Sequence, residues 1–414
     1  MRAKKLLVWG FINLCGFFPT FAQAWVPTGL SSYTWGYFAV SGDGNTLIAS
    51  PFYPKVGVII STNGGADWHT NTLPVYFPFG NDTPFNISLT SVTCSTDGRK
   101  MAGVYVGGII CTSTNSGATW VTNDVPLAGW YSIAGSADGI KLVAAAGNSG
   151  SSGPIYTSTN SGLTWQPTTA PSNNWRCVAS SADGVKLVAG ASYSIATVFV
   201  STNSGITWFD TGLPTNSDWT VACSSDGNKM IAVNYSNFSD PENTQGRLFT
   251  STDAGTTWEL NPQVSGFFGS VAMSADGNKV FIVSYDGSVY VSTNFGANWT
   301  INDLPDGEAF VNIAASADGG KLLTGSVFSS DPSGNGVSYF SSSVYAPQIN
   351  LERVSTNVAL SWFLPSANFV LQQSSDFADW SDSTNRPLLN LTNLQNQITL
   401  PLNASNRFYR LKTP

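Results

Sequence analysis

Hydrophobic and polar residues alternate in short runs along the chain, and no segment has the spacing of an amphipathic helix. Between residues 130 and 165, tight-turn residues separate such runs, as at Asp138-Gly139 and Asn160-Ser161-Gly162. The runs cover residues 131–136, 141–146 and 155–158, and a further one begins at Thr164. The pattern predicts a four-stranded antiparallel sheet in about 40 residues.

A turn sequence with the pattern Ser-Thr-Asn-x-Gly-x-x-Trp occurs six times, with Asp253 in place of Asn in one copy. The copies are Ser61–Trp68, Ser113–Trp120, Ser158–Trp165, Ser201–Trp208, Ser251–Trp258 and Ser292–Trp299. They start 52, 45, 43, 50 and 41 residues apart. This spacing is typical of a repeat architecture, so we expect one sheet in each repeat.

A second motif, Ser-x-Asp-Gly, occurs seven times and alternates with the first. Its copies are Ser41–Gly44, Ser95–Gly98, Ser136–Gly139, Ser181–Gly184, Ser224–Gly227, Ser274–Gly277 and Ser316–Gly319. The seventh copy is not followed by a motif Trp, but Trp25–Leu30 resembles segments that begin at the other motif tryptophans, such as Trp208–Leu213. We therefore expect the N-terminal segment to supply the missing fourth strand, which would close a ring without an open sheet edge.

The Ser-Thr-Asn-x-Gly-x-x-Trp segments resemble the Asp-box (BNR) repeats of sialidase-type β-propellers. The segment Trp175–Gly184 is similar to repeats of photosystem II assembly factors, which bind partners without catalysis. The resemblance implies an all-β fold with a seven-bladed β-propeller over residues 25–345. We expect the motif to be structural, because its polar side chain bonds to its own turn and its Trp packs on the sheet. A positive φ is expected at Gly65, Gly117, Gly162, Gly205, Gly255 and Gly296.

Both ends of the chain differ from the repeats. Residues 1–24 have a basic start, an apolar stretch and the small-residue ending Ala22-Gln23-Ala24, which predicts a signal peptide and a secreted, extracellular or periplasmic protein. The apolar stretch is short for a bilayer, and we expect no membrane insertion. Residues 346–414 lack both motifs and resemble C-terminal modules of secreted bacterial proteins. Their alternating runs predict a small β-sandwich and cover Asn357–Trp362, Phe369–Gln373, Gln397–Leu402 and Arg407–Leu411.

The chain is acidic, with a net charge of −7. Removal of Arg2, Lys4 and Lys5 with the signal peptide gives −7 − 3 = −10. This charge argues against nucleic acid as a partner. The remaining cysteines, Cys94, Cys111, Cys177 and Cys223, fall on strands that are not neighbours, so we expect small buried thiols without disulfides. We expect no cofactor and no metal, and the only histidine, His69, follows a motif Trp.

Function is expected on the face opposite the repeated turns. Because strand direction alternates, both motif turns share one face, and the loops that differ between repeats share the other. These variable loops cover residues 51–55, 73–90, 147–154, 234–246 and 326–336. A glycan or a protein ligand bound on this variable-loop face, by a monomer, is the predicted role.

One aromatic position recurs at the start of the innermost strands, six residues before the Ser of Ser-x-Asp-Gly. In order, this position holds Trp35, Leu89, Trp130, Trp175, Asp218 (followed by Trp219), Phe268 and Phe310. Large apolar ring faces suit stacking on sugars, so the candidate ligand-binding residues are Trp35, Trp130, Trp175, Trp219, Phe268 and Phe310. The alternative is packing between neighbouring sheets.

Catalysis finds little support in the sequence. Sialidases use three arginines around the substrate carboxylate, but Arg99, Arg176 and Arg247 occupy different positions in their repeats. Other Asp-box glycosidases use two carboxylates across a cleft. The candidate carboxylates Asp82, Asp218, Asp240, Glu242, Asp286, Asp306 and Glu308 are not paired by any spacing. The sequence thus predicts a non-catalytic binding or scaffold protein. The alternative is an extracellular glycoside hydrolase, either sialidase-like or polysaccharide-degrading.

Overall fold

The computed structural model describes most of the chain as β-strands and turns. It describes residues 25–30, 33–53, 57–74, 88–126, 128–148, 151–192, 197–215, 218–235, 246–304, 309–328, 337–342, 349–355, 357–364, 369–375, 379–392, 394–401 and 408–412. The expected signal peptide lies outside these residues, as does part of every variable loop. Within the described ranges, no helix is long and apolar enough to cross a membrane.

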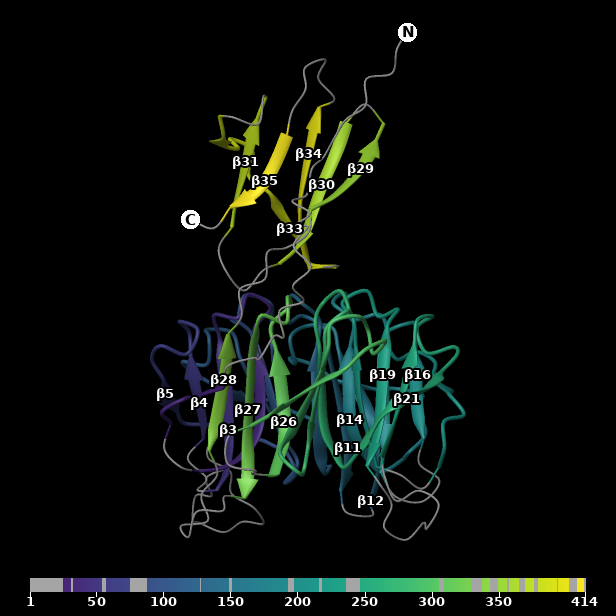
Figure 1. Ribbon diagram of the computed structural model, residues 1–414. Helices are drawn as coiled ribbons and strands as arrows, with labels where there is room; N and C mark the ends of the chain where they lie inside the picture. The colour runs from purple at the N-terminus through teal and green to yellow at the C-terminus, as the bar shows by residue number, and fades with distance from the viewer. Residues whose placement is uncertain are drawn as a thin grey trace.

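The described strands before residue 343 form seven four-stranded antiparallel sheets, which stand side by side in Figure 1. The first strands are β2 (Thr34–Val40), β6 (Ser91–Cys94), β10 (Trp130–Gly135), β14 (Trp175–Ser180), β18 (Asp218–Cys223), β22 (Phe268–Met273) and β26 (Ala309–Ala315). The second strands are β3 (Leu47–Tyr53), β7 (Met101–Tyr105), β11 (Leu142–Asn148), β15 (Leu187–Ala191), β19 (Met230–Tyr235), β23 (Val280–Ser284) and β27 (Lys321–Phe328).

The two outer strand positions follow the same repeat. The third strands are β4 (Val58–Ser61), β8 (Ile109–Ser113), β12 (Ser151–Ser158), β16 (Val198–Ser201), β20 (Gly246–Ser251), β24 (Ser288–Ser292) and β28 (Ser338–Ser342). The fourth strands are β5 (His69–Asn71), β9 (Val121–Thr122), β13 (Gln166–Pro167), β17 (Phe209–Asp210), β21 (Glu259–Gly266), β25 (Thr300–Asp303) and β1 (Trp25–Pro27). Six of these fourth strands begin directly after a motif Trp, as the sequence predicts.

The sheets are arranged in a closed ring. The first strand of each sheet contacts the first strand of the next, and β26 contacts β2. The first strands therefore surround a common axis, which is the arrangement of blades in a β-propeller.

The N-terminal strand closes the ring. Strand β1 pairs antiparallel with β28, placing Trp25 opposite Ser341 and Pro27 opposite Tyr339. The Thr28 amide extends the pairing and donates to the Ser338 carbonyl at 3.0 Å. Trp25 packs against the hydrophobic cluster that contains Leu304 and Tyr339. The predicted closure is confirmed, and one sheet is built from segments far apart in the sequence.

The Ser-Thr-Asn-x-Gly-x-x-Trp turns are held by their own side chains. In the copy that begins at Ser158, the Ser hydroxyl donates to Asn160 Oδ1 at 3.0 Å and accepts from the Gly162 amide at 2.9 Å. Asn160 Oδ1 also accepts from the Thr164 amide at 2.9 Å. Asp253 replaces Asn in one copy, and its hydrogen bonds from Thr257 and Ser251 lower its pKa to about 2. A structural role therefore accounts for every polar side chain in this turn.

The motif glycines have the predicted positive φ. The values are 94° at Gly65, 80° at Gly117, 87° at Gly162, 85° at Gly205, 79° at Gly255 and 84° at Gly296. A Cβ added at Gly162 would also lie 2.5 Å from Asn123 Nδ2. Steric pressure and the dihedral together exclude side chains at this position.

We predict that Gly162→Val lowers the free energy of unfolding by about 1–3 kcal/mol through backbone strain. Urea denaturation would measure this loss. Ligand affinity should not change, because the turn lies on the repeated face. A matched control is Leu163→Ala, which alters an exposed side chain in the same turn and should leave stability unchanged. A large affinity loss at normal stability would contradict the structural role.

The Ser-x-Asp-Gly turns link the sheets through a ring of backbone hydrogen bonds. The residue after each motif Ser donates its amide to the carbonyl of the equivalent residue in the next sheet, as Ala137 does to Ala182 at 2.8 Å. The described series runs Thr96→Ala137→Ala182→Ser225→Ala275→Ala317→Gly42, and Asp43 donates to Thr96 at 3.3 Å. The ring therefore continues across the junction between the last and first sheets.

A lysine belt reinforces the same face. The lysine two residues after the motif Gly crosses to the next turn and donates from Nζ to a backbone carbonyl there. The donor–acceptor pairs are Lys141–Asp183 (2.8 Å), Lys186–Asp226 (2.9 Å), Lys229–Asp276 (3.1 Å), Lys279–Asp318 (2.6 Å) and Lys321–Gly44 (2.9 Å). Five of the 18 lysines and arginines of the chain thus bond between neighbouring sheets.

The two motif turns of one sheet lie together, as expected from strand direction. The Ser161 amide donates to the Ile140 carbonyl at 2.7 Å, and the Ser204 amide donates to the Val185 carbonyl at 2.8 Å. These bonds join the first-motif turn to the second-motif turn within a sheet. The repeated turns therefore occupy one face, and the other loops lie at the opposite ends of the strands.

The C-terminal residues form two further sheets. One contains β29 (Asn350–Val354), β30 (Asn357–Phe363), β34 (Gln395–Pro401) and β33 (Leu388–Asn390), and the other contains β32 (Ser381–Asp382), β31 (Val370–Ser374) and β35 (Phe408–Lys412). Leu360 and Ile398 from the first sheet and Leu371 from the second belong to one hydrophobic cluster. The four predicted runs match β30, β31, β34 and β35 to within two residues.

The four cysteines Cys94, Cys111, Cys177 and Cys223 are free thiols. Cys94 and Cys111 lie on the first and third strands of one sheet, as predicted. Burial raises the pKa of the Cys94, Cys111 and Cys223 thiols to about 12. Because the thiolate is the reactive form, these cysteines are unreactive packing residues at neutral pH.

Candidate functional site

In several sheets, the pairing between the first and second strands shifts register near the axis of the ring. In β10 and β14 the register shifts between Trp130 and Ser132 and between Trp175 and Cys177. Each shift is a β-bulge that inserts one extra residue, Tyr131 in β10 and Arg176 in β14. Bulges change the direction of a side chain and are common beside functional sites. Similar shifts occur in β2, β22 and β26.

The described pairing shows no register shift in two first strands, β6 and β18. Strand β18 pairs with β19 without a register shift. Because β18 has no extra bulge residue, its buried aromatic side chain is Trp219, five residues before the motif Ser. In the other repeats, the large apolar residue lies six residues before that Ser. Asp218 is left at the start of the strand, next to β14. This explains why the sequence shows Asp where the other repeats have a large apolar residue.

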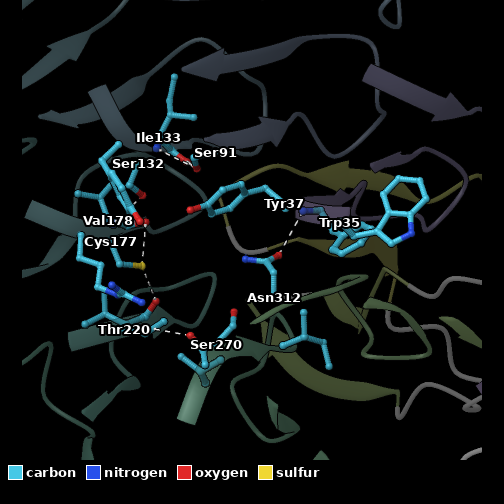
Figure 2. A pocket seen from close by; sticks show the side chains of 18 of the residues that line it. Trp35, Tyr37, Ser91, Ser132, Ile133, Cys177, Val178, Thr220, Ser270 and Asn312 are labelled. Atoms are coloured by element: carbon cyan, nitrogen blue, oxygen red, sulfur yellow. Dashed lines mark hydrogen bonds between the residues drawn. The ribbon is translucent and has the colours of Figure 1, made fainter. Parts of the chain in front are cut away.

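Polar side chains four residues before a motif Ser bond to the next sheet in three places. Ser91 Oγ accepts from the Ile133 amide at 3.2 Å, and Ser132 Oγ accepts from the Val178 amide at 3.0 Å. Asn312 Oδ1 accepts from the Phe38 amide at 3.2 Å and joins the last sheet to the first. Figure 2 shows these small polar side chains around the axis, with the ring of Tyr37 projecting among them. Tyr37 is the one large side chain at this position.

These positions surround an axial cavity of about 390 Å³. It lies at the ends of the first strands away from the Ser-x-Asp-Gly turns, on the variable-loop face. The lining residues combine phenols, hydroxyls and aliphatic groups with one guanidinium, and they include Tyr37, Phe52, Tyr131, Ser132, Ile133, Arg176, Val178, Thr220, Val271, Tyr285 and Asn312. Mixed apolar walls with a few polar groups are typical of ligand pockets of this size.

Arg176 provides the charge in the cavity. Its Nη1 lies 3.4 Å from Asp218 Oδ2, and their side chains are 27% and 14% exposed. Ser192 donates a hydrogen bond to the other oxygen of Asp218. Burial would lower the pKa of Arg176, but Tyr131 and Asp218 outweigh this effect and raise it. The guanidinium therefore stays charged and is held from one side.

Three tyrosines surround this guanidinium. Tyr37 interacts with Tyr131, and Tyr285 interacts with Arg176. Burial, together with the neighbouring phenol of Tyr131, raises the pKa of Tyr37 well above its usual value. Burial also raises the pKa of Tyr285, although Arg176 opposes the shift. Both phenols keep their protons at neutral pH, so they can donate hydrogen bonds to a ligand.

The aromatic candidates from the sequence are buried between sheets. The side chains of Trp35, Trp130, Trp175 and Trp219 are 0% exposed, and Phe268 is 2% exposed. Trp130 packs edge-to-face on Tyr156 with ring centroids 5.5 Å apart, and Trp175 packs in the same way on Phe199. The side chain of Phe310 lies outside the described residues. Trp35 also lies at the wall of the axial cavity, whereas Trp130, Trp175, Trp219 and Phe268 are not among its described lining residues, and the packing alternative fits their environment.

The three arginine candidates do not converge. Arg99 follows a Ser-x-Asp-Gly turn on the repeated face, and Arg247 lies on a third strand, so Arg176 alone of the three lines the cavity. The loop carboxylates Asp82, Asp240, Glu242, Asp306 and Glu308 lie outside the described residues. Among the described residues that line the cavity, none is Asp or Glu.

A second, smaller hollow lies at the other end of the ring axis, on the face of the repeated turns. A hollow of about 180 Å³ there is lined by the small residues of the Ser-x-Asp-Gly turns, among them Gly42, Ala137 and Ala275. Leu394, from the turn before β34 in the C-terminal sheets, lies at this hollow. The repeated face is therefore next to the C-terminal part of the chain. The cavity at Arg176 is at the other end.

Sequence reasoning did not bring Tyr37, Tyr131, Tyr285 and Arg176 together in one cavity. A signal for two of them was present. Tyr131 and Arg176 stand five residues before a motif Ser, where the other repeats have Gly36, Thr90, Trp219, Gly269 and Val311. At this position only Tyr131 and Arg176 are both large and polar, and both line the cavity.

No family model matches the chain, and no curated protein sequence matches it. Solved structures are similar in fold at low identity. The GH74 enzyme of Niastella koreensis has a TM-score of 0.58 and 14% identity over 82% of this chain, which spans 59% of the enzyme. YCF48 bound to D1 peptide has a TM-score of 0.55 and 14% identity over 82% of this chain and all (100%) of YCF48. YCF48 from Cyanidioschyzon merolae has the same TM-score, 0.55, and identity, 14%, over 77% of this chain and 99% of its own. The chain thus has the β-propeller fold of repeated four-stranded antiparallel blades.

Proposed function

We propose that this protein is a secreted, non-catalytic binding protein whose axial cavity receives a protein ligand. In this proposal, residues 25–345 form a seven-bladed Asp-box β-propeller and residues 346–414 form a β-sandwich. The signal-peptide pattern of residues 1–24 supports export from the cytoplasm. The ligand site is on the variable-loop face of a monomer.

The observation that carries the proposal is the cavity itself. Its volume of about 390 Å³ accommodates one or two side chains of a partner but not a globular surface. Its lining mixes aliphatic walls with phenol and hydroxyl groups, which suits the mixed chemistry of a peptide. The similarity in fold to YCF48 bound to D1 peptide supports the same class of ligand.

Phe52 adds a contact at the rim. It lines the cavity from β3, yet its side chain is 61% exposed. A large apolar side chain that is exposed beside a pocket is typical of a binding hot spot, because a ligand would remove it from water. By contrast, Leu163 is 76% exposed on the repeated face, far from the cavity in the fold.

The test is selection of binders from a random peptide display library against the protein that begins at Trp25, with a glycan array in parallel. For the selected peptides, Phe52→Ala should weaken binding by about tenfold or more, as expected for a hot spot. Thermal stability should not change, because the side chain is exposed. Leu163→Ala is the matched control and should leave affinity unchanged.

Two outcomes would contradict the proposal. One is selection of no peptide while the array identifies a glycan. The other is equal binding by wild type and Phe52→Ala. The glycoside hydrolase alternative draws support from the similarity in fold to GH74, and release of reducing ends from a polysaccharide by the purified protein would favour it.

A further inference from the structure

The guanidinium of Arg176 in the axial cavity indicates which chemical group of a ligand would bind there. Arg176 has five N–H donors in a planar fork. Asp218 contacts Nη1 at 3.4 Å, and Tyr285 also interacts with the guanidinium. A single contact of this length is looser than a two-point guanidinium–carboxylate pair. The fork therefore has donors for an additional acceptor from the cavity side.

Asp218 is fixed away from the cavity axis. Ser192 donates to Asp218 Oδ1, while Asp218 Oδ2 is the oxygen that contacts Arg176. Asp218 is not among the residues that line the cavity, whereas Arg176 is. The carboxylate thus positions the guanidinium from the side, and the described lining of the cavity contains the cation but not its carboxylate. Asp218 is a positioning residue in this arrangement.

The tyrosines complete a site for an anion. The phenols of Tyr37, Tyr131 and Tyr285 line the same cavity as Arg176. Tyrosine phenols are protonated at neutral pH, and burial raises the pKa of Tyr37 and Tyr285 further, so both can donate. Donors from several blades thus converge with the guanidinium on one space. An acceptor with two oxygens suits a guanidinium fork better than a neutral carbonyl does.

The position of the site at the axis restricts how a ligand can enter. First strands from neighbouring sheets surround the cavity, and it lies at one end of the channel. A chain that passes through would have to continue to the other mouth, where small turn residues and Leu394 lie. A ligand therefore enters end-on from the variable-loop face. An end of the ligand chain can therefore reach Arg176, whereas a segment that continues in both directions cannot.

We propose that Arg176, with Tyr131 and Tyr285, binds a free carboxylate at the end of a peptide ligand. This inference rests on the proposed function and names the ligand group at the same site. The aliphatic side chains of Ile133, Val178 and Val271 on the cavity wall would contact the terminal residue. The ligand class is thus a peptide with a free acid end and an apolar last residue.

The test compares an acid with its amide. Calorimetry would measure binding of N-acetylleucine and N-acetylleucinamide to the protein that begins at Trp25, with glucuronate as a sugar acid. We expect the amide to bind about 10- to 100-fold more weakly than the acid, the range of a hydrogen bond to a charged group. Glucuronate should bind more weakly than N-acetylleucine, because it lacks an apolar side chain.

Variants test whether Arg176 causes the preference for the acid over the amide. Arg176→Gln should abolish the preference for the acid. This variant leaves Asp218 without its ion-pair partner, so the double variant Arg176→Gln with Asp218→Asn is also needed, and it should lose the preference as well. Tyr131→Phe removes one donor without changing charge and should reduce the preference in part. Arg247→Gln makes the same charge change on an exposed side chain of a third strand and should have no effect. Thermal melting of each variant shows that it is folded.

Three results would overturn the inference. They are equal binding of acid and amide, unchanged acid preference in the folded double variant, and tighter binding of glucuronate than of N-acetylleucine. In each case, peptide selection and its loss in Phe52→Ala would still support the proposed function. The absence of any peptide binding would instead count against both.

Discussion

Deletion of residues 25–30 should unfold the β-propeller or lower its melting temperature strongly. Strand β1 supplies the fourth strand of the sheet that contains β26, β27 and β28, and Trp25 covers Leu304 and Tyr339. Its loss exposes this apolar cluster and opens the edge of β28, whose backbone groups lose their partners. Circular dichroism during heating would measure the effect.

The control for this deletion is the chain that begins at Trp25, which keeps the strand and lacks only the expected signal peptide. Trp25→Ala is an intermediate test, because it removes the packing and leaves the backbone pairing with β28 intact. We expect its melting temperature to fall between those of the control and the deletion. A deletion that melts like the control would show that closure does not stabilise the ring.

Replacement of Trp175 by Ala should cost about 3–5 kcal/mol, the range for truncation of a buried Trp. The ring is 0% exposed and lies edge-to-face on Phe199 at 5.5 Å between centroids. Trp130→Ala should cost a similar amount through its contact with Tyr156. Because whole domains are stable by about 5–15 kcal/mol, the double variant should be largely unfolded. Urea denaturation of both single variants would measure the losses.

Trp175→Phe is the matched control, since it keeps an aromatic ring beside Phe199 and should cost less than Ala. The outcome that would contradict the packing role is normal stability together with lost retention on a polysaccharide. That result would restore these tryptophans as ligand-binding residues.

The fold could be predicted from the sequence because the same physical requirements recur in every repeat. Each sheet needs a tight turn with a positive φ and a Trp that covers the sheet, so the motifs appear at regular spacing. The missing seventh Trp motif even indicated how the ring closes, and the pairing of β1 with β28 confirms it. Repetition makes local signals reliable, because a position that recurs seven times cannot be an accident of composition.

The candidate site could not be predicted in the same way, because function depends on residues that break the repeat. Arg176 and Tyr131 project into the cavity through bulges, and a bulge leaves no regular mark in the hydrophobic pattern. The functional hypothesis from the sequence rests on the recurring tryptophans, but Trp130 and Trp175 are buried against Tyr156 and Phe199. Asp218 seemed an exception in the sequence and proved to be the partner of Arg176.

The closure of the ring by its two ends has a consequence for biosynthesis. Thr28 contacts Ser338, a residue 310 positions later in the chain. At a translation rate of about 5–20 residues per second, the first strand waits for its partner for roughly 15–60 s. Until then the nascent chain is an open arc with its earliest strand unpaired. A chaperone that binds the nascent chain would therefore have to cover that strand until β28 has been made.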